Sequence, residues 1–181
     1  MWYQCGMRIR EGGLGDVPAV LALGDEAVVW MNARGNTTQW GTEPWTGHEK
    51  LEALTHNWAA GGGMRVLETE DGDVAGALVI TEERQPYVSP APDGERELYV
   101  NFLIVSRRWA GKGLGATLIE RARQEAAERG IDLIRVDCWA GQDGSLVKQY
   151  ERLGFTPVEP FVKDWPGMLL AMRLSEPAAA A

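Results

Sequence analysis

The segment from residue 97 to 139 restricts the fold of this chain more than any other part of the sequence. It begins with a run rich in β-formers, Glu97 to Val105, and it ends with a second strand-like run, Ile131 to Trp139. Between them, apolar residues recur at the spacing of a buried helix stripe, at Leu114, Leu118, Ala122 and Ala126. The segment therefore predicts one strand-helix-strand crossover, which is right-handed in nearly all proteins.

The remaining patterns predict antiparallel strands and further helices on either side of this crossover. Before the crossover, we expect a strand over 7–11, helices over 17–33 (with Asp16 as N-cap) and 47–60, paired strands over 64–69 and 74–81, and an exposed loop over 85–95. After it, we expect a helix over 146–153 and two closing strands, over 156–163 and 168–174, around Pro166 and Gly167. This order indicates an α/β (α+β) fold, with a mixed, mostly antiparallel twisted sheet of about seven strands flanked by about four helices.

Size and composition fit one domain. With 181 residues and 45% hydrophobic residues, the chain can bury a sizeable core, and no second domain is required. We expect a single domain over residues 1–174. Residues 175–181 lack a core-forming pattern, so we expect a disordered tail there.

Charge and cysteine content narrow the class of protein. The net charge of -8 argues against a nucleic-acid binder, whose surface would carry a basic stripe. The first residues lack the apolar core of a signal peptide, and no apolar run approaches the roughly 20 residues that span a bilayer. Cys5 and Cys138 do not suggest a disulfide framework, and His48 and His56 stand without cysteine ligands. We expect a cytoplasmic protein without membrane contact and without a metal.

The stretch from Arg108 to Ala116 is typical of an anion-binding loop. It places three glycines, Gly111, Gly113 and Gly115, directly before the predicted helix, where free backbone N–H groups suit a phosphate or pyrophosphate. The nucleoside-triphosphate loop does not fit, because Lys112 is followed by Gly113 rather than Ser or Thr.

The dinucleotide-binding pattern remains an alternative for this loop. Gly111-x-Gly113-x-x-Ala116 satisfies it formally, and Asp137 lies near the end of the next strand. Against it, the loop does not turn directly after Val105, and the chain has only one strand-helix-strand unit where two halves are usual.

Two motifs together resemble the GNAT acyltransferases. The residues from Arg108 to Gly113 fit that family's Gln/Arg-x-x-Gly-x-Gly/Ala pyrophosphate loop. The residues from Gln149 to Phe155 resemble its second signature, a Tyr on the last helix before Gly-Phe. The element order from about residue 7 to 174 is similar to the family's fold as well.

The resemblance implies that acetyl-CoA is the co-substrate, and it carries a set of binding residues with it. The coenzyme would be held by Leu103, Ile104, Val105, Arg108, Gly111, Lys112, Gly113, Leu114, Gly115 and Ala116. The loop would bind the pyrophosphate, and the strand residues would pair through their main chain with the pantetheine arm. Many members have an Asn seven residues before the Tyr, but that position is Asp143 here (150 minus 143), so Gln142, Ser145 or the main chain could replace the contact.

The resemblance also implies catalytic roles. Tyr150 would donate a proton to the departing thiolate, since a phenol is protonated at neutral pH; alternatively it only packs in the core. Glu97 would be the general base, although a solvated strand end is an equally good interpretation. Asn101 or Asp137 could act instead through water. Cys138 has no His nearby in sequence, so we expect direct attack in a ternary complex rather than an acyl-enzyme.

The acceptor is expected to be a small-molecule amine. Trp30, Trp40 and Trp45 surround a loop that borders the acceptor pocket in this fold, where they could hold a cation, and Glu43 could supply charge. Asn101 completes the predicted acceptor site. The same tryptophans could equally fill the core. A catalytically silent coenzyme A sensor and a dinucleotide-dependent oxidoreductase stay open as other functions, and a homodimer is compatible with the sequence.

Overall fold

The computed structural model describes residues 2–3, 6–141 and 143–175. The chain divides into two compact units. The first comprises residues 1–79 and 102–118, and the second comprises residues 80–101 and 119–181. Strands β4 and β5 and helix α3 each contribute residues to both units, which are described in turn.

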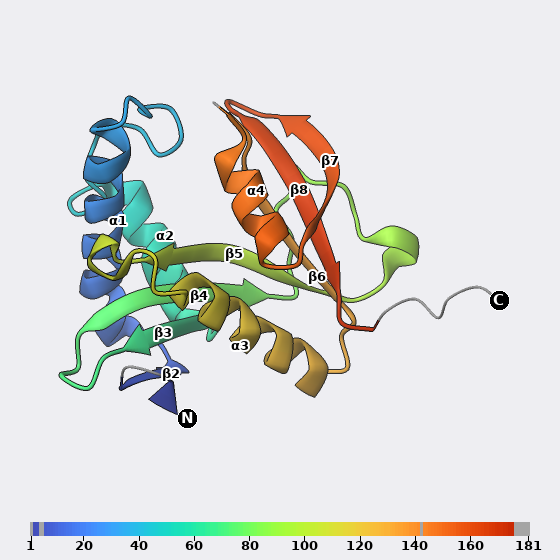
Figure 1. Cartoon of the computed structure of the whole chain (residues 1–181), viewed down its shortest axis with the longest axis horizontal. Helices are drawn as coiled ribbons and strands as arrows, with labels where there is room; N and C mark the ends of the chain where they lie inside the picture. Colours follow the sequence, from blue (N-terminus) through green and yellow to red (C-terminus); the bar gives the residue numbers. More distant parts are fainter. Residues whose placement is uncertain (1, 4–5, 142, 176–181) are drawn as a thin grey trace. The chain divides into compact units, whose positions relative to one another are not determined.

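The first unit contains a sheet with two helices (Figure 1). Its strands follow the order β1 (Trp2–Tyr3), β2 (Met7–Glu11), β3 (Met64–Glu68), β4 (Val74–Thr81) and β5 (Glu97–Val105). The pairs from β1 to β4 are antiparallel. Helices α1 (Val17–Asn32) and α2 (Glu49–Ala60) bury their apolar faces with Val66, Ala77, Val79, Phe102 and Ile104 of the sheet. The core of this unit therefore lies between the two helices and the sheet.

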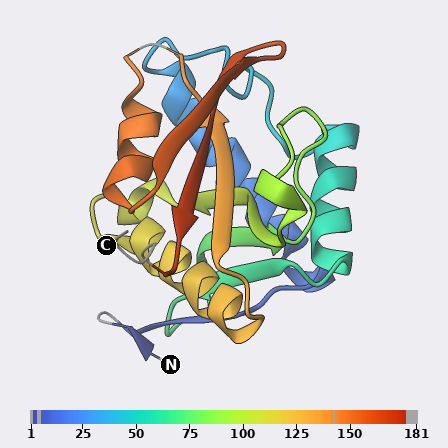
Figure 2. The same cartoon turned by 90° about the vertical axis from the view of Figure 1, so that its right-hand side faces the viewer.

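The second unit continues from β5 in the order β6 (Leu133–Trp139), β8 (Pro166–Arg173) and β7 (Thr156–Val162). Strand β6 is parallel to β5 and antiparallel to β8. Helices α3 (Leu114–Glu128) and α4 (Ser145–Arg152) lie on one side of β6 and β8, and the loop before β5 lies on the other (Figure 2). One face of this sheet is thus covered by helices and the other by a loop.

The fold class and the crossover are confirmed. The segment from β5 through α3 to β6 gives parallel strands, and β3 and β4 form the predicted hairpin. The described residues contain four α-helices, at the predicted places. Helix α1 starts where predicted, but the Asp16 carboxylate does not cap it, because it accepts the Gly13 N–H and two hydrogen bonds from Arg10.

Three local features differ from the sequence-based expectations. Strand β1 was not expected. Pro166 and Gly167 do not form the closing turn, because they pair with Val162 and Phe161 inside the sheet, and the turn falls at 163–165. The loop over 85–95 is not fully exposed: Val88 packs against Tyr99 and Leu169.

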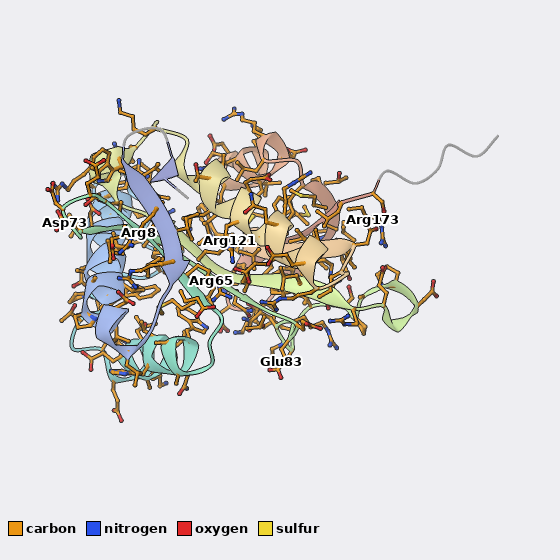
Figure 3. All side chains as sticks on the ribbon, turned by 90° about the horizontal axis from the view of Figure 1, so that it is seen from below. Arg8, Arg65, Asp73, Glu83, Arg121 and Arg173 are labelled. Carbon is orange, nitrogen blue, oxygen red and sulfur yellow. The ribbon has the colours of Figure 1, made fainter. Side chains whose placement is uncertain are left out.

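The first residue of the predicted tail, Ser175, has a hydrogen-bond partner. Ser175 donates its backbone N–H to Asp132 at 2.8 Å, and its hydroxyl donates to the same carboxylate at 2.5 Å. Arg173, near the end of β8, also contacts Asp132, at 3.3 Å (Figure 3). The rest of the predicted tail, 176–181, lies outside the described residues.

Candidate functional site

Ser106 fastens the start of the glycine loop to the first unit. Its backbone N–H donates to Ala75 O at 2.8 Å, which ties the end of β5 to β4. Its hydroxyl donates to Glu26 Oε1 at 3.3 Å and accepts the Arg108 N–H at 3.2 Å. The chain between β5 and α3 therefore leaves the sheet in a fixed direction.

Two glycines shape the loop that follows. Gly111 and Gly113 have φ values of 75° and 74°, in the left-handed region that side chains other than glycine adopt at a cost. The helix bond of Thr117 goes to Gly113 O at 3.1 Å. Within the described part of this unit, no partner is found for the N–H groups of Gly113, Leu114, Gly115 and Ala116. The start of α3 thus presents consecutive free donors and the positive end of the helix dipole.

Basic side chains flank the loop. The Arg107 guanidinium lies 3.9 Å from the ring centroid of Trp30, and Arg34 lies 4.2 Å from the same ring. Burial, followed by the charge of Arg34, lowers the pKa of Arg107. The Arg108 side chain is exposed and lies 4.0 Å from the carboxylate of Asp73. Asp73 is on the turn between β3 and β4 (Figure 3). Such an exposed pair adds little stability, which leaves Arg108 available to an anion.

The last residues of β5 lie close to β4. Ile104 is buried, while Leu103 and Val105 are half-buried. A Cβ added at Gly76 would lie 2.8 Å from Ile104 O, so only glycine permits this approach of the two backbones. The glycine on β4 therefore fixes the main chain of the strand predicted to pair with the pantetheine arm.

The predicted acceptor tryptophans have two kinds of neighbours: Trp40 and Trp45 pack against other aromatic rings, whereas Trp30 also contacts arginines. Trp40 and Trp45 have ring centroids 4.9 Å apart, and Phe102 lies 5.4 Å from Trp45 and 4.8 Å from Trp58. Trp30 packs against the same core but also contacts the two arginines described above.

Asp25 on α1 holds the backbone of Trp45. The Asp25 carboxylate accepts the Trp45 N–H at 2.6 Å and the Thr46 hydroxyl at 2.6 Å. Burial raises the pKa of Asp25, but these hydrogen bonds outweigh it and keep the pKa below its usual value. A Cβ at Gly24 would lie 2.4 Å from the indole of Trp45, which is 4% exposed with no partner for Nε1 among the described residues. Glu43 is exposed.

Tyr150 is buried in the second unit. It contacts Phe155 edge-on, with ring centroids 5.7 Å apart. Burial raises the pKa of its phenol, and the nearby Cys138 and Asp137 raise it further. The phenol therefore stays protonated at neutral pH, as a proton donor requires.

Glu97 is engaged by an arginine. Both of its carboxylate oxygens accept hydrogen bonds from Arg135, and both side chains are buried. Arg135 also donates to Ser89 O at 2.8 Å. Its role as general base stays a prediction, and the geometry gives Glu97 a second explanation as the charge partner of a buried arginine.

The remaining predicted residues lie as follows. Asn101 donates to Thr81 Oγ1 at 2.8 Å and accepts from Gln85 at 2.9 Å. The Asp143 carboxylate accepts the N–H of Ser145, the first residue of α4, at 3.0 Å, while Gly144 is the N-cap residue. Gln142 lies outside the described residues.

Comparison with known proteins decides the family. The Acetyltransferase (GNAT) family model matches residues 32–155, which is more than half of the chain. The chain belongs to the GNAT acetyltransferase family. No curated protein matches it in sequence.

Solved structures with the GNAT fold resemble nearly the whole chain. A GNAT acetyltransferase from Listeria monocytogenes is 23% identical, covering 93% of this chain and 95% of its own, with a TM-score of 0.72. A candidate phosphinothricin N-acetyltransferase is 22% identical over 94% and 99%, with a TM-score of 0.69. The yncA protein of Salmonella typhimurium, solved with its cofactor acetyl-CoA, is 22% identical over 96% and 97%, with a TM-score of 0.64. At these identities the likeness supports the fold.

The GNAT motifs did not reveal one polar cluster in the second unit. The Tyr99 hydroxyl donates to Asp137 Oδ1 at 2.5 Å, and the Tyr87 hydroxyl donates to Oδ2 at 3.1 Å. The sequence indicates Asp137 only as an alternative base acting through water and as the acidic residue of the dinucleotide-binding pattern, not as the partner of two phenols. Parallel pairing of β5 with β6 would have pointed to Tyr99, but Tyr87 comes from the loop and gives no sequence signal.

The described residues contain no group of three or more His, Cys, Asp or Glu side chains that could hold a metal ion. His48 and His56 are both exposed. Over the same residues, every helix is too short or too polar to cross a membrane.

Proposed function

We propose that this GNAT protein transfers an acetyl group from acetyl-CoA to a primary amine of a small molecule, in a complex that holds both substrates. The amine nitrogen bonds to the carbonyl carbon of the thioester, and the carbon-sulfur bond breaks. The nitrogen loses a proton, and the thiolate of coenzyme A gains one. The observation that carries this proposal is the glycine loop, whose free N–H groups at the start of α3 match a pyrophosphate.

The chain's own residues fit the coenzyme. The N–H groups from Gly113 to Ala116 would bind the pyrophosphate, with Arg108 adding charge. The main chain of 103–105 would pair with the pantetheine arm. Tyr150 would protonate the leaving thiolate, which its raised pKa permits because the phenol is uncharged before the step.

Direct attack is supported by the state of the cysteine. Burial raises the pKa of Cys138 to about 12, and Asp137 adds to the effect. Only a thiolate is a strong nucleophile, so this thiol is a poor candidate for an acyl-enzyme. A free buried thiol also agrees with the reducing cytoplasm that we propose as the location.

A small amine is favoured as the acceptor by two features. The net charge of -8 favours a cationic substrate, and one of the similar structures carries the name of an enzyme for a small amine. Trp30, Trp40, Glu43 and Trp45 of the first unit and Asn101 of the second stay the predicted acceptor residues.

Ligand stabilisation and turnover test the proposal together. We expect acetyl-CoA and coenzyme A to raise the unfolding temperature, and NAD and NADP to leave it unchanged. A panel of primary amines should then give release of coenzyme A thiol. Stabilisation by NAD alone would support the oxidoreductase, while coenzyme binding without thiol release from any amine would support the sensor.

Substitutions at two glycines test whether the loop binds the coenzyme. A Cβ at Gly115 meets no protein atom within 4 Å, and the φ of this residue is not positive. Gly115→Ala should therefore stabilise the protein by about 0.5–1 kcal/mol. It should at the same time weaken acetyl-CoA binding, because the methyl group separates the pyrophosphate from the main chain. Gly15→Ala, equally open, is the matched control and should leave binding unchanged. Unaltered acetyl-CoA binding in Gly115→Ala would contradict the proposal that this loop binds the pyrophosphate.

Tyr150→Phe tests the proton donor. We expect turnover to fall at least about tenfold while the acetyl-CoA midpoint stays constant, since the hydroxyl acts in the transition state. Unchanged turnover would show that Tyr150 only packs.

A further inference from the structure

Three buried carboxylates in the described part of the chain have arginine partners. In the first unit, Glu68 accepts from Arg8 at 2.7 Å and from Arg10. In the second unit, Glu125 accepts from Arg121 at 2.8 Å and from Arg129 at 2.9 Å. Glu97 has Arg135. Figure 3 labels Arg8 and Arg121 on their elements. A buried charge without a cation is costly, and this protein neutralises these three.

Asp137 breaks this pattern. It is half-buried on β6, and its two hydrogen-bond donors are neutral phenols, those of Tyr99 and Tyr87. Tyr99 is fully buried, with an exposed fraction of 0%. Each carboxylate oxygen accepts one phenol hydrogen bond and keeps further capacity as an acceptor. The carboxylate is therefore oriented but not neutralised.

The charged groups around Asp137 are otherwise occupied. Arg135, on the same strand, is held by Glu97 and Ser89. Lys163 lies 4.5 Å from the ring centroid of Tyr87, so it touches the ring rather than the carboxylate. Among the described residues no cation is in ion-pair contact with Asp137. The site therefore holds one unpaired negative charge among phenols.

Two further titratable groups share this region. Asp137 raises the pKa of both Cys138 and Tyr150, so its charge is felt at the thiol next to it and at the proposed proton donor. Burial, followed by the field of Asp137, raises the pKa of Tyr87 and Tyr99, which keeps both phenols protonated as donors. Burial also raises the pKa of Asp137 itself, and the hydrogen bonds from Tyr99 and Tyr87 oppose this effect.

We propose that Asp137, held by Tyr87 and Tyr99, binds the ammonium group of a primary amine and takes its proton, which leaves the neutral amine that acetyl transfer requires. This inference rests on the proposed acetyl transfer. The ammonium nitrogen gives one proton to a carboxylate oxygen, which leaves a neutral amine and a neutral carboxyl. The neutral carboxyl of Asp137 then releases its proton to the solvent, which restores the carboxylate.

Binding of an ammonium ion can be observed without turnover. Protein labelled with ¹³C at the aspartate carboxyls shows the Asp137 resonance by difference from Asp137→Asn. Butylammonium chloride is the probe, and sodium chloride at equal ionic strength is its control. We expect a saturable shift of the Asp137 resonance with the amine and none with sodium. An unmoved resonance would overturn the proposal.

Turnover gives the second readout. With the fastest amine of the panel, Asp137→Asn should lower kcat/KM by at least about a hundredfold, as loss of a general base does. The fall of kcat/KM toward acid pH should disappear, and the acetyl-CoA midpoint should stay constant. Asp164→Asn, an exposed carboxylate in the nearby β7–β8 turn, is the matched control. Wild-type kcat/KM and an unchanged pH profile in Asp137→Asn would refute the assignment.

A milder variant covers the case in which Asp137→Asn does not fold. Tyr87→Phe removes one donor from the carboxylate, which should move the acid limb of the pH profile to higher pH. An unmoved limb would argue against Asp137. If wild-type protein releases no thiol with any amine, the acetyl transfer itself fails, and the carboxyl titration still decides whether Asp137 binds an ammonium ion.

Discussion

Glu97 and Asp137 lie on neighbouring parallel strands, yet the protein treats their charges differently. Both carboxylate oxygens of Glu97 accept hydrogen bonds from Arg135, whereas the side chains that donate to Asp137 among the described residues are two phenols. Side chains two residues apart on a strand share a face, so Glu97 lies on the face of Tyr99, and Arg135 on that of Asp137. The difference shows how one sheet face can carry a charge that stabilises the fold beside a charge left free for a ligand.

The largest effect is expected from breaking the neutralised pair. Arg135→Met leaves the Glu97 carboxylate buried without a cation and removes the hydrogen bond to Ser89 O. We expect a loss of about 3–5 kcal/mol in the free energy of unfolding, measured by urea denaturation. Adding Glu97→Gln to this variant removes the stranded charge, so the double variant should recover much of the loss. A double variant no more stable than Arg135→Met would show that the arginine acts by packing instead.

The phenols of Asp137 should matter less, and unequally. Tyr99→Phe removes a 2.5 Å hydrogen bond to a carboxylate in a fully buried position, for which we expect a loss of about 1.5–3 kcal/mol. Tyr87 is half-buried and its bond is 3.1 Å long, so Tyr87→Phe should cost less. Urea denaturation of both variants checks the order. Equal losses would mean that water replaces either phenol.

The backbone part of this picture could be predicted from the sequence. The β-formers of 97–105, the four-residue spacing of 114–126 and the run over 131–139 decide the crossover, because local periodicity is what strands and helices require. The glycine loop could also be predicted, because the φ values of 75° and 74° at Gly111 and Gly113 favour glycine. The coenzyme that we propose for the loop rests on the resemblance of the loop, together with Tyr150 and its neighbours, to the GNAT motifs.

The side-chain part could not be predicted, because it depends on tertiary register and loop path. The sequence neighbours of Glu97 do not reveal that Arg135 on the adjacent strand is its partner, and its role as a base stays a prediction. Tyr87 is 50 positions from Asp137 in the chain, and only the course of the 85–95 loop brings the two together. Ser106 likewise gave no signal of its bond to Glu26. Such contacts join residues that no local pattern relates.

The pH dependence of protein stability should differ between an unpaired aspartate and a paired one. Burial raises the pKa of Asp137 above its usual 3.8, so the native state binds its proton more tightly than the unfolded state does. Its contribution to stability is present at low pH and is lost as pH rises through the raised pKa. The stability of Asp137→Asn relative to wild type should therefore increase with pH above about 4.

The contribution of Asp16 to stability should change with pH in the opposite direction. A hydrogen bond from Arg10 lowers the pKa of Asp16, so its stabilising contribution is present above the usual value of 3.8 and is lost as pH falls through the lowered pKa. Asp16→Asn should therefore be most destabilising at neutral pH and should approach wild type in acid. Urea denaturation between about pH 3 and 8 measures both trends. Trends of the same sign in the two variants would contradict the contrast between a paired and an unpaired carboxylate.

The smallest effect is expected from the cation that lies near Asp137 without touching it. Lys163 is exposed and lies over the Tyr87 ring, so Lys163→Met should cost only about 0.5–1 kcal/mol, the value of an exposed cation-π contact. The charge of Lys163 lowers the pKa of Asp137, so its removal should raise that pKa, which the labelled carboxyl resonance can follow. A loss as large as that of Arg135→Met would mean that Lys163 neutralises Asp137 in solution. Asp137 would then resemble Glu97, and its charge would no longer be free for an acceptor.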